Sequence, residues 1–137
     1  MNGHEIIELL KYGETVTLEC IEAGFEIPKS VWETYSSFAN TAGGIILLGI
    51  EEHKNERDFS KRYTIKGVRN PVQQIKDFWN TINSEKVSNN ILTDRDVGTC
   101  EMEEGIVIWI HVPQATYSQK PVYINGNPFR GSFPKKF

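Results

Sequence analysis

The sequence predicts an α+β fold in which a mixed β-sheet packs against two main helices. Three observations support this prediction. The apolar run at 45–50 is typical of a central strand that is covered on both faces. Segments 28–42 and 71–83 place apolar residues on one side of a helix. The alternating segments 97–102 and 106–112 are typical of an antiparallel pair of strands.

The first half of the chain alternates between helix and strand signals. Residues 3–12 predict a short helix that stops at Gly13, and a β-branched alternation predicts a strand over 15–23. Pro28 suits the first turn of the next helix, which we expect to end at about Ala42, before two glycines.

The second half continues with a charged loop over 51–62 and a strand over 63–68. Asn70 and Pro71 are typical of a helix cap followed by a first-turn proline, so we expect a helix to begin there. After the pair of strands at 97–112, residues 120–125 predict one more short strand.

Length and composition indicate one globular domain over residues 1–137. Hydrophobic residues make up 39% of the chain and charged residues 24%, which is ordinary for a soluble protein. No apolar run approaches the roughly 20 residues of a membrane span, and no secretory signal precedes the first helix. We therefore expect a cytoplasmic protein with no membrane partner, in which Cys20 and Cys100 are buried, small apolar residues.

Charge is strongly segregated along the chain, although the net charge is −3. Residues 1–52 carry nine acids and two bases, whereas residues 53–76 carry two acids and seven bases. Residues 77–104 are again acidic, and residues 105–137 carry four bases and no acid. The basic segments either form a surface that faces phosphates or are neutralised by the acidic segments beside them.

Four short motifs occur in an order that resembles a known family. Residues 39–44 read ANTAGG and lead into the apolar strand and the acidic pair Glu51-Glu52. Residues 14–19 read ETVTLE, residues 65–68 read IKGV and residues 120–123 read KPVY. Together they resemble the Schlafen/AlbA-like domain, over about residues 14–125.

This resemblance implies a mixed sheet with two main helices and a DNA-binding domain of the transcriptional-regulator type. It also implies that the domain is the N-terminal part of a longer protein. A homodimer is left open. A domain that only mediates protein interaction or dimerisation is a further alternative, in which the charges serve solubility.

The turn motif itself consists of Asn40, Thr41, Gly43 and Gly44. The side chains of Asn40 and Thr41 are suited to hydrogen-bonding the last helical carbonyl groups or a neighbouring loop, and the glycines allow a sharp turn. The simplest interpretation is a helix-to-strand turn. No phosphate-binding loop of the GxxxxGK[ST] kind is present, so a nucleotide site of that kind is not expected.

The nuclease members of the family imply an enzymatic alternative. Their three metal-binding carboxylates correspond to Glu14, Glu19 and Glu52, with Glu51 as a substitute, and they would hold Mg²⁺ or Mn²⁺ for RNA cleavage. The first two are five positions apart, which places them on opposite faces of a regular strand unless Glu14 precedes the strand or a bulge intervenes. The lysine that usually follows the strand glutamate is replaced by Ile21. Under the binding interpretation no cofactor is expected.

The binding interpretation depends on cations that neutralise phosphates and make affinity dependent on salt. Aromatic residues near these cations offer stacking surfaces for unpaired bases; we expect Tyr63 and Tyr123 to pack in the core, whereas Phe129 and Phe133 lie in a turn-rich tail. The predicted phosphate-binding residues are Lys54, Arg57, Lys61, Arg62, Lys66 and Arg69 near the middle loop, and Lys120, Arg130, Lys135 and Lys136 in the tail.

Overall fold

The computed structural model describes residues 1–12 and 17–126 of the chain. Its main sheet has the strand order β1-β2-β6-β5. The strands are β1 (Leu18–Ile21), β2 (Gly44–Leu48), β5 (Val97–Met102) and β6 (Gly105–Val112). Strand β1 runs parallel to β2, whereas β6 runs antiparallel to both β2 and β5. The sheet is therefore mixed, and the predicted α+β class is confirmed.

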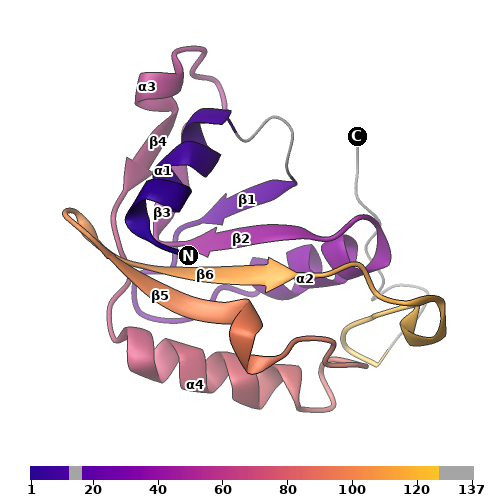
Figure 1. Ribbon diagram of the computed structural model, residues 1–137. Coiled ribbons are helices and arrows are strands. Elements are labelled where there is room, and N and C mark those ends of the chain that lie inside the picture. The colour runs from indigo at the N-terminus through magenta and orange to yellow at the C-terminus, as the bar shows by residue number, and fades with distance from the viewer. Residues whose placement is uncertain (13–16, 127–137) are drawn as a thin grey trace.

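Helices cover both faces of this sheet (Figure 1). Helices α2 (Ser30–Asn40) and α4 (Pro71–Ile82) pack against one face, and α1 (Gly3–Tyr12) packs against the other. Ile46 of β2 lies in the first core, whereas Leu47 lies in the second, because successive strand residues point to opposite faces. The prediction that the apolar strand is buried on both sides is thus confirmed.

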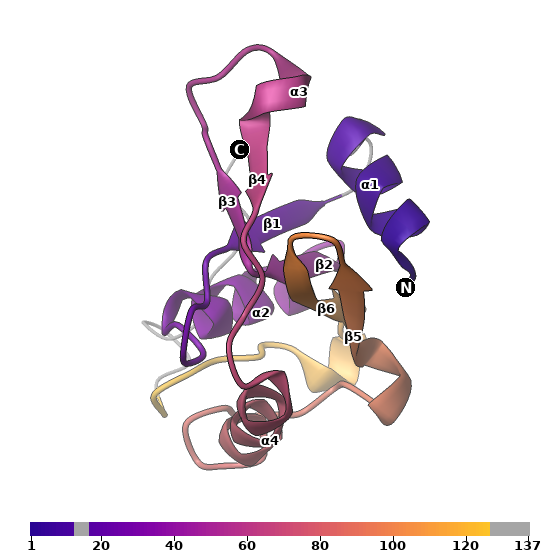
Figure 2. The same cartoon turned by 90° about the vertical axis from the view of Figure 1, so that its left-hand side faces the viewer.

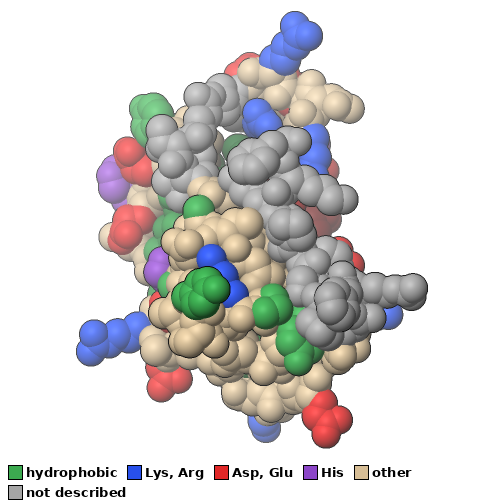
Figure 3. Space-filling view, turned by 90° about the vertical axis from the view of Figure 1, so that its right-hand side faces the viewer, with side chains coloured by type: hydrophobic (Ala, Val, Ile, Leu, Met, Phe, Trp, Pro, Cys, Tyr) green, Lys and Arg blue, Asp and Glu red, His purple; other side chains and the backbone are tan. Residues whose placement is uncertain are grey.

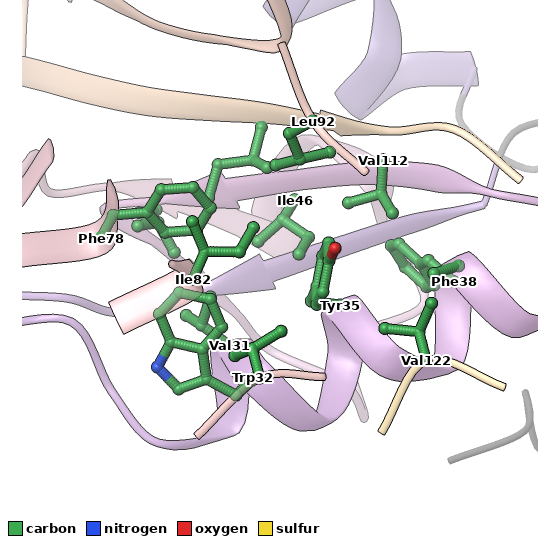
Figure 4. Close-up of a cluster of buried hydrophobic side chains, with 14 of the residues drawn as sticks. Val31, Trp32, Tyr35, Phe38, Ile46, Phe78, Ile82, Leu92, Val112 and Val122 are labelled. Atoms are coloured by element: carbon green, nitrogen blue, oxygen red, sulfur yellow. The ribbon is translucent and has the colours of Figure 1, made fainter. Parts of the chain in front are cut away.

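The larger core lies between the sheet and helices α2 and α4 (Figure 4). Trp32 of α2 stacks on Phe78 of α4, with ring centroids 5.0 Å apart. Tyr35 is fully buried, and its hydroxyl group donates to the carbonyl oxygen of Asn89 and accepts from the amide of Ile91. Burial raises the pKa of Tyr35 to about 12. This core joins the two helices through aromatic packing and joins α2 to the loop after α4.

The apolar run at 45–50 is not one strand, which corrects the prediction. Strand β2 ends at Leu48, and a separate strand, β3 (Ile50–Glu52), follows Gly49. Gly49 has a φ of +98°, and its carbonyl oxygen accepts hydrogen bonds from the amides of Lys66 and Gly67. The chain therefore turns out of the main sheet at Gly49, and β3 pairs antiparallel with β4 (Tyr63–Ile65) in a second sheet of two strands.

Three other expectations are corrected in detail. The segment 51–62 is not wholly a loop, because β3 extends to Glu52 and a short helix, α3, covers Phe59–Arg62. Residues 120–125 form no strand; Ile124 makes only an isolated bridge to Val87. Asn70 has a left-handed conformation, and its carbonyl group rather than its side chain contacts the first turn of α4.

Cys20 and Cys100 are buried and free, as predicted. Within the described residues, every helix is too short or too polar to cross a lipid bilayer.

Candidate nucleic-acid interface

The segment between β3 and β4 projects away from the main sheet (Figures 1 and 2). We call residues 53–62 the cationic loop. Its two ends are joined by a hydrogen bond of 2.7 Å from the amide of His53 to the carbonyl oxygen of Arg62. Asp58 caps helix α3, because its Oδ1 accepts from the amide of Ser60 at 3.0 Å and from the hydroxyl group at 2.7 Å. These hydrogen bonds give the cationic loop a defined shape.

Three cations of this loop are exposed: Lys54, Arg57 and Lys61. None of them forms an ion pair with a described residue. The two acids of the loop instead accept hydrogen bonds within it, since Glu56 accepts from the amide of Asp58 at 3.1 Å and Asp58 accepts from Ser60. Hydrogen bonds from Ser60 lower the pKa of Asp58. The two acids of the loop therefore do not neutralise its three exposed cations.

Two other predicted phosphate-binding residues already have acidic partners. Arg62 donates to Oε2 of Glu52 at 3.2 Å. Lys66 forms ion pairs with Glu51 and, at 3.2 Å, with Glu22. The hydrogen bond from Lys66 lowers the pKa of Glu51. For these two cations, the structure matches the alternative in which acidic segments neutralise basic ones.

The remaining predicted cations lie elsewhere. Arg69 is exposed just before α4, and Lys120 lies at the end of the 3₁₀ turn Tyr117–Gln119, far from α3 in both views of the ribbon (Figures 1 and 2). Arg130, Lys135 and Lys136 lie outside the described residues. On the face shown in Figure 3, the visible Lys and Arg side chains are scattered rather than gathered. The exposed cations Lys54, Arg57 and Lys61 share the cationic loop.

Two of the three predicted carboxylates lie close enough to influence each other. Burial raises the pKa of Glu19, Lys54 lowers it, and the negative charge of Glu52 raises it. Burial raises the pKa of the neighbouring Cys20 thiol to about 12, and the negative charges of Glu52 and Glu19 add smaller contributions in the same direction. Strands β1 and β3 thus bring Glu19 and Glu52 together beside Lys54.

This pair does not amount to the expected metal site. No group of three metal-ligating side chains occurs among residues 1–12 and 17–126. Glu52 already accepts hydrogen bonds from Arg62, and the substitute Glu51 is held by Lys66. Glu14 lies outside the described residues. The described carboxylates alone do not fit a three-carboxylate Mg²⁺ or Mn²⁺ centre.

The turn motif contacts the chain itself. The Asn40 amide donates to the carbonyl oxygen of Val122 and accepts from its amide, both at 2.8 Å. Thr41 donates to the carbonyl oxygen of Ser37 at 2.8 Å, within the last turn of α2. Gly43 has a φ of +77°, and a Cβ there would lie 2.6 Å from the carbonyl oxygen of Val112. The contacts of Asn40 join the ANTAGG motif to the KPVY motif.

The sequence did not single out Phe25 as an exposed aromatic residue. Phe25 is 68% exposed, and the Arg69 guanidinium carbon lies 4.8 Å from the centre of its ring. The available signal was an aromatic residue between Gly24 and Glu26, in a segment with neither helical nor strand periodicity. By contrast, Tyr63 is partly buried against the smaller core, as expected.

Comparison with known proteins agrees with this architecture. The model of the Schlafen, AlbA_2 family matches residues 14–133, so the chain belongs to this family. The fold is similar to the solution NMR structure of the N-terminal domain of a protein from Nitrosomonas europaea, named as related to the ATP-dependent DNA helicase RecG. The TM-score is 0.67 at 22% identity, covering 96% of this chain and 86% of that one. No curated protein matches the sequence.

Proposed function

We propose that this domain binds nucleic acid through the cationic loop. The observation that carries the proposal is that Lys54, Arg57 and Lys61 are exposed on one ordered loop and form no ion pair with a described residue, although Lys54 also lies beside Glu19. Three cations that are free to neutralise phosphates release counterions, and this favours association. Membership of the Schlafen AlbA_2 family supports the proposal, as does the name of the similar helicase-related protein.

Contacts of this kind position the protein on a phosphate backbone and carry little sequence information. We therefore propose weakly selective binding by this domain, as one module of a longer DNA-binding protein of the transcriptional-regulator type. Target selection then depends on other contacts. The tail cations Arg130, Lys135 and Lys136 remain part of this proposal as further phosphate-binding residues.

The test is reversal of the three loop charges. Without metal, the native protein should retard labelled DNA or RNA in a gel, and affinity should fall steeply with salt. The triple variant Lys54→Glu, Arg57→Glu and Lys61→Glu should bind weakly, and the slope of log K against log salt should decrease by about 2 to 3, as three lost phosphate contacts predict.

A matched control has the same change in net charge on other elements. The cations Lys11, Lys76 and Arg95 are exposed on α1, on α4 and before β5. Their reversal to Glu should reduce affinity much less than reversal of the loop. Equal losses in the two triple variants would show that only net charge matters and would remove the cationic loop from the proposal. Absence of retention at low salt would favour an interaction or dimerisation domain instead.

A metal-dependent ribonuclease is the second candidate, because Glu19 and Glu52 lie beside each other and beside Lys54. This activity requires a further ligand, for which Glu14 is the family's position. Structured RNA should then be cleaved only with Mg²⁺ or Mn²⁺, and Glu19→Gln should abolish cleavage. If the native protein leaves RNA intact with both metals, the ribonuclease candidate is wrong for this chain.

A further inference from the structure

Phe25 and Arg69 form an exposed pair beside the start of α4. The guanidinium carbon of Arg69 lies 4.8 Å from the centre of the Phe25 ring, within the range of a cation–π contact. Even with this contact, 68% of Phe25 is exposed to solvent. With most of its surface exposed, Phe25 gains little stabilisation from burial and presents an apolar ring to solvent.

The backbone under this pair is held in place by a buried amide. The side chain of Gln74 is 1% exposed, and its Nε2 lies 3.0 Å from the carbonyl oxygen of Ala23, 3.2 Å from that of Gly24 and 2.9 Å from that of Arg69. The amide of Arg69 also donates to the carbonyl oxygen of Gly24 at 2.7 Å. One side chain therefore fixes the backbone beside both members of the pair.

The burial of the Gln74 side chain has an energetic cost. The Oε1 atom of Gln74 is buried and has no hydrogen-bond partner in the described part of the chain. A buried acceptor without a partner lowers the free energy of unfolding. The polar residue is nevertheless placed where it orders the backbone beneath an exposed aromatic ring. Prior ordering of a binding surface reduces the entropy that is lost when a ligand binds.

The segment that carries Arg69 leads directly from β4, at the end of the cationic loop, to α4. In Figure 2, the segment between β4 and α4 runs down from strands β3 and β4, which carry the cationic loop, to α4. The segment between β1 and α2 lies beside its lower end. Between them, Lys66 is neutralised by Glu51 and Glu22. Arg69 follows Arg62 by seven positions, so the Cα atoms of these two residues lie at most about 25 Å apart. A flexible strand of several nucleotides is long enough to reach both.

We propose that the Phe25–Arg69 pair is a stacking site for an unpaired base of single-stranded nucleic acid whose phosphates contact the cationic loop. This inference rests on the proposed function and adds to it the class of nucleic acid. Aromatic faces and guanidinium planes stack on any base, so the site selects single strands over duplexes rather than one sequence over another. The charged residues of the segment between β1 and α2 are Glu22, which pairs with Lys66, and Glu26 and Lys29, which carry opposite charges.

The test compares a labelled homopyrimidine strand of about twelve nucleotides, within the usual range of site sizes, with abasic strands and duplexes of equal length. Abasic strands keep every phosphate but lack the stacking partner. By fluorescence anisotropy, Phe25→Ala should weaken binding of the normal strand about tenfold, as loss of one stacked base predicts. It should leave binding of the abasic strand unchanged. Phe25→Trp should restore the native affinity.

Tyr117 provides a matched control, because it is 97% exposed and lies in a 3₁₀ turn at a distance from the cationic loop in both ribbon views. Tyr117→Ala should bind like the native protein. An unchanged affinity in Phe25→Ala, or an equal loss on normal and abasic strands, would overturn the stacking site while leaving the cationic loop intact. If the native protein binds no nucleic acid, the proposed function fails and this inference with it. If the native protein binds duplex as tightly as single strand, only the inference fails.

Discussion

Glu19 is a carboxylate whose ionisation is disfavoured in the folded protein. Burial and Glu52 raise its pKa above the ordinary value, against the opposing effect of Lys54. A raised pKa means that the unfolded chain loses this proton at a lower pH than the native protein does. The contribution of Glu19 to stability is therefore present below the unfolded pKa and decreases as pH rises through the native one.

The variant Glu19→Gln tests this sign. Gln does not titrate, so the free energy of unfolding of the variant relative to the native protein should be higher at pH 7 than at pH 4. Urea denaturation at both pH values measures the difference, and Glu85→Gln, which changes an exposed carboxylate elsewhere, is the control. A relative stability that is independent of pH, or that falls between pH 4 and pH 7, contradicts the raised pKa.

At the scale of elements, the junction between β2 and β3 decides where the cationic loop lies. Gly49 turns the chain out of the main sheet, and a Cβ at this position would lie 2.8 Å from the carbonyl carbon of Gly67. Gly49→Ala should therefore reduce the free energy of unfolding by about 2 kcal/mol or more, because a left-handed conformation and a backbone clash act together. Gly24→Ala, where a Cβ has open space, is the control for thermal denaturation. Equal melting temperatures for the two variants would contradict this account.

The elements that depend on local periodicity could be predicted from the sequence. Helices at 28–42 and 71–83 and the hairpin at 97–112 appear in the structure with small shifts at their ends. The break at Gly49 could not be predicted, because the residues that require it, Lys66 and Gly67, contact it only through tertiary structure. The strand expected at 120–125 failed for a related reason: an Asn40 side chain, rather than a neighbouring strand, pairs with Val122.

At the scale of the whole molecule, charge segregation drew attention to the segment that contains the cationic loop but did not show which of its charges are neutralised. Lys66 contacts Glu22, which is 44 positions away in the sequence. This ion pair forms only because the fold places the end of β1 beside the segment between β4 and α4. Phe25 was missed because its surroundings depend on tertiary contacts: Gln74, a residue on another element, holds the backbone just before it. The carboxylate pair of Glu19 and Glu52 was anticipated through the family resemblance, whereas the partner of Glu52, Arg62, was not.

The hydrogen bonds between Asn40 and Val122 bear on which part of the chain unfolds locally first. The two residues are 82 positions apart, so the contact forms only after most of the intervening chain is ordered. The 121–124 segment has only one isolated bridge to other described backbone, whereas β2 and β6 are each paired on two sides, so its local opening should require less free energy than theirs. Amide hydrogen exchange should reveal this order, with Val122 exchanging faster than Ile46 and faster still in Asn40→Ala. Segment 121–124 would then unfold locally before β2 and β6, while the main sheet stays intact.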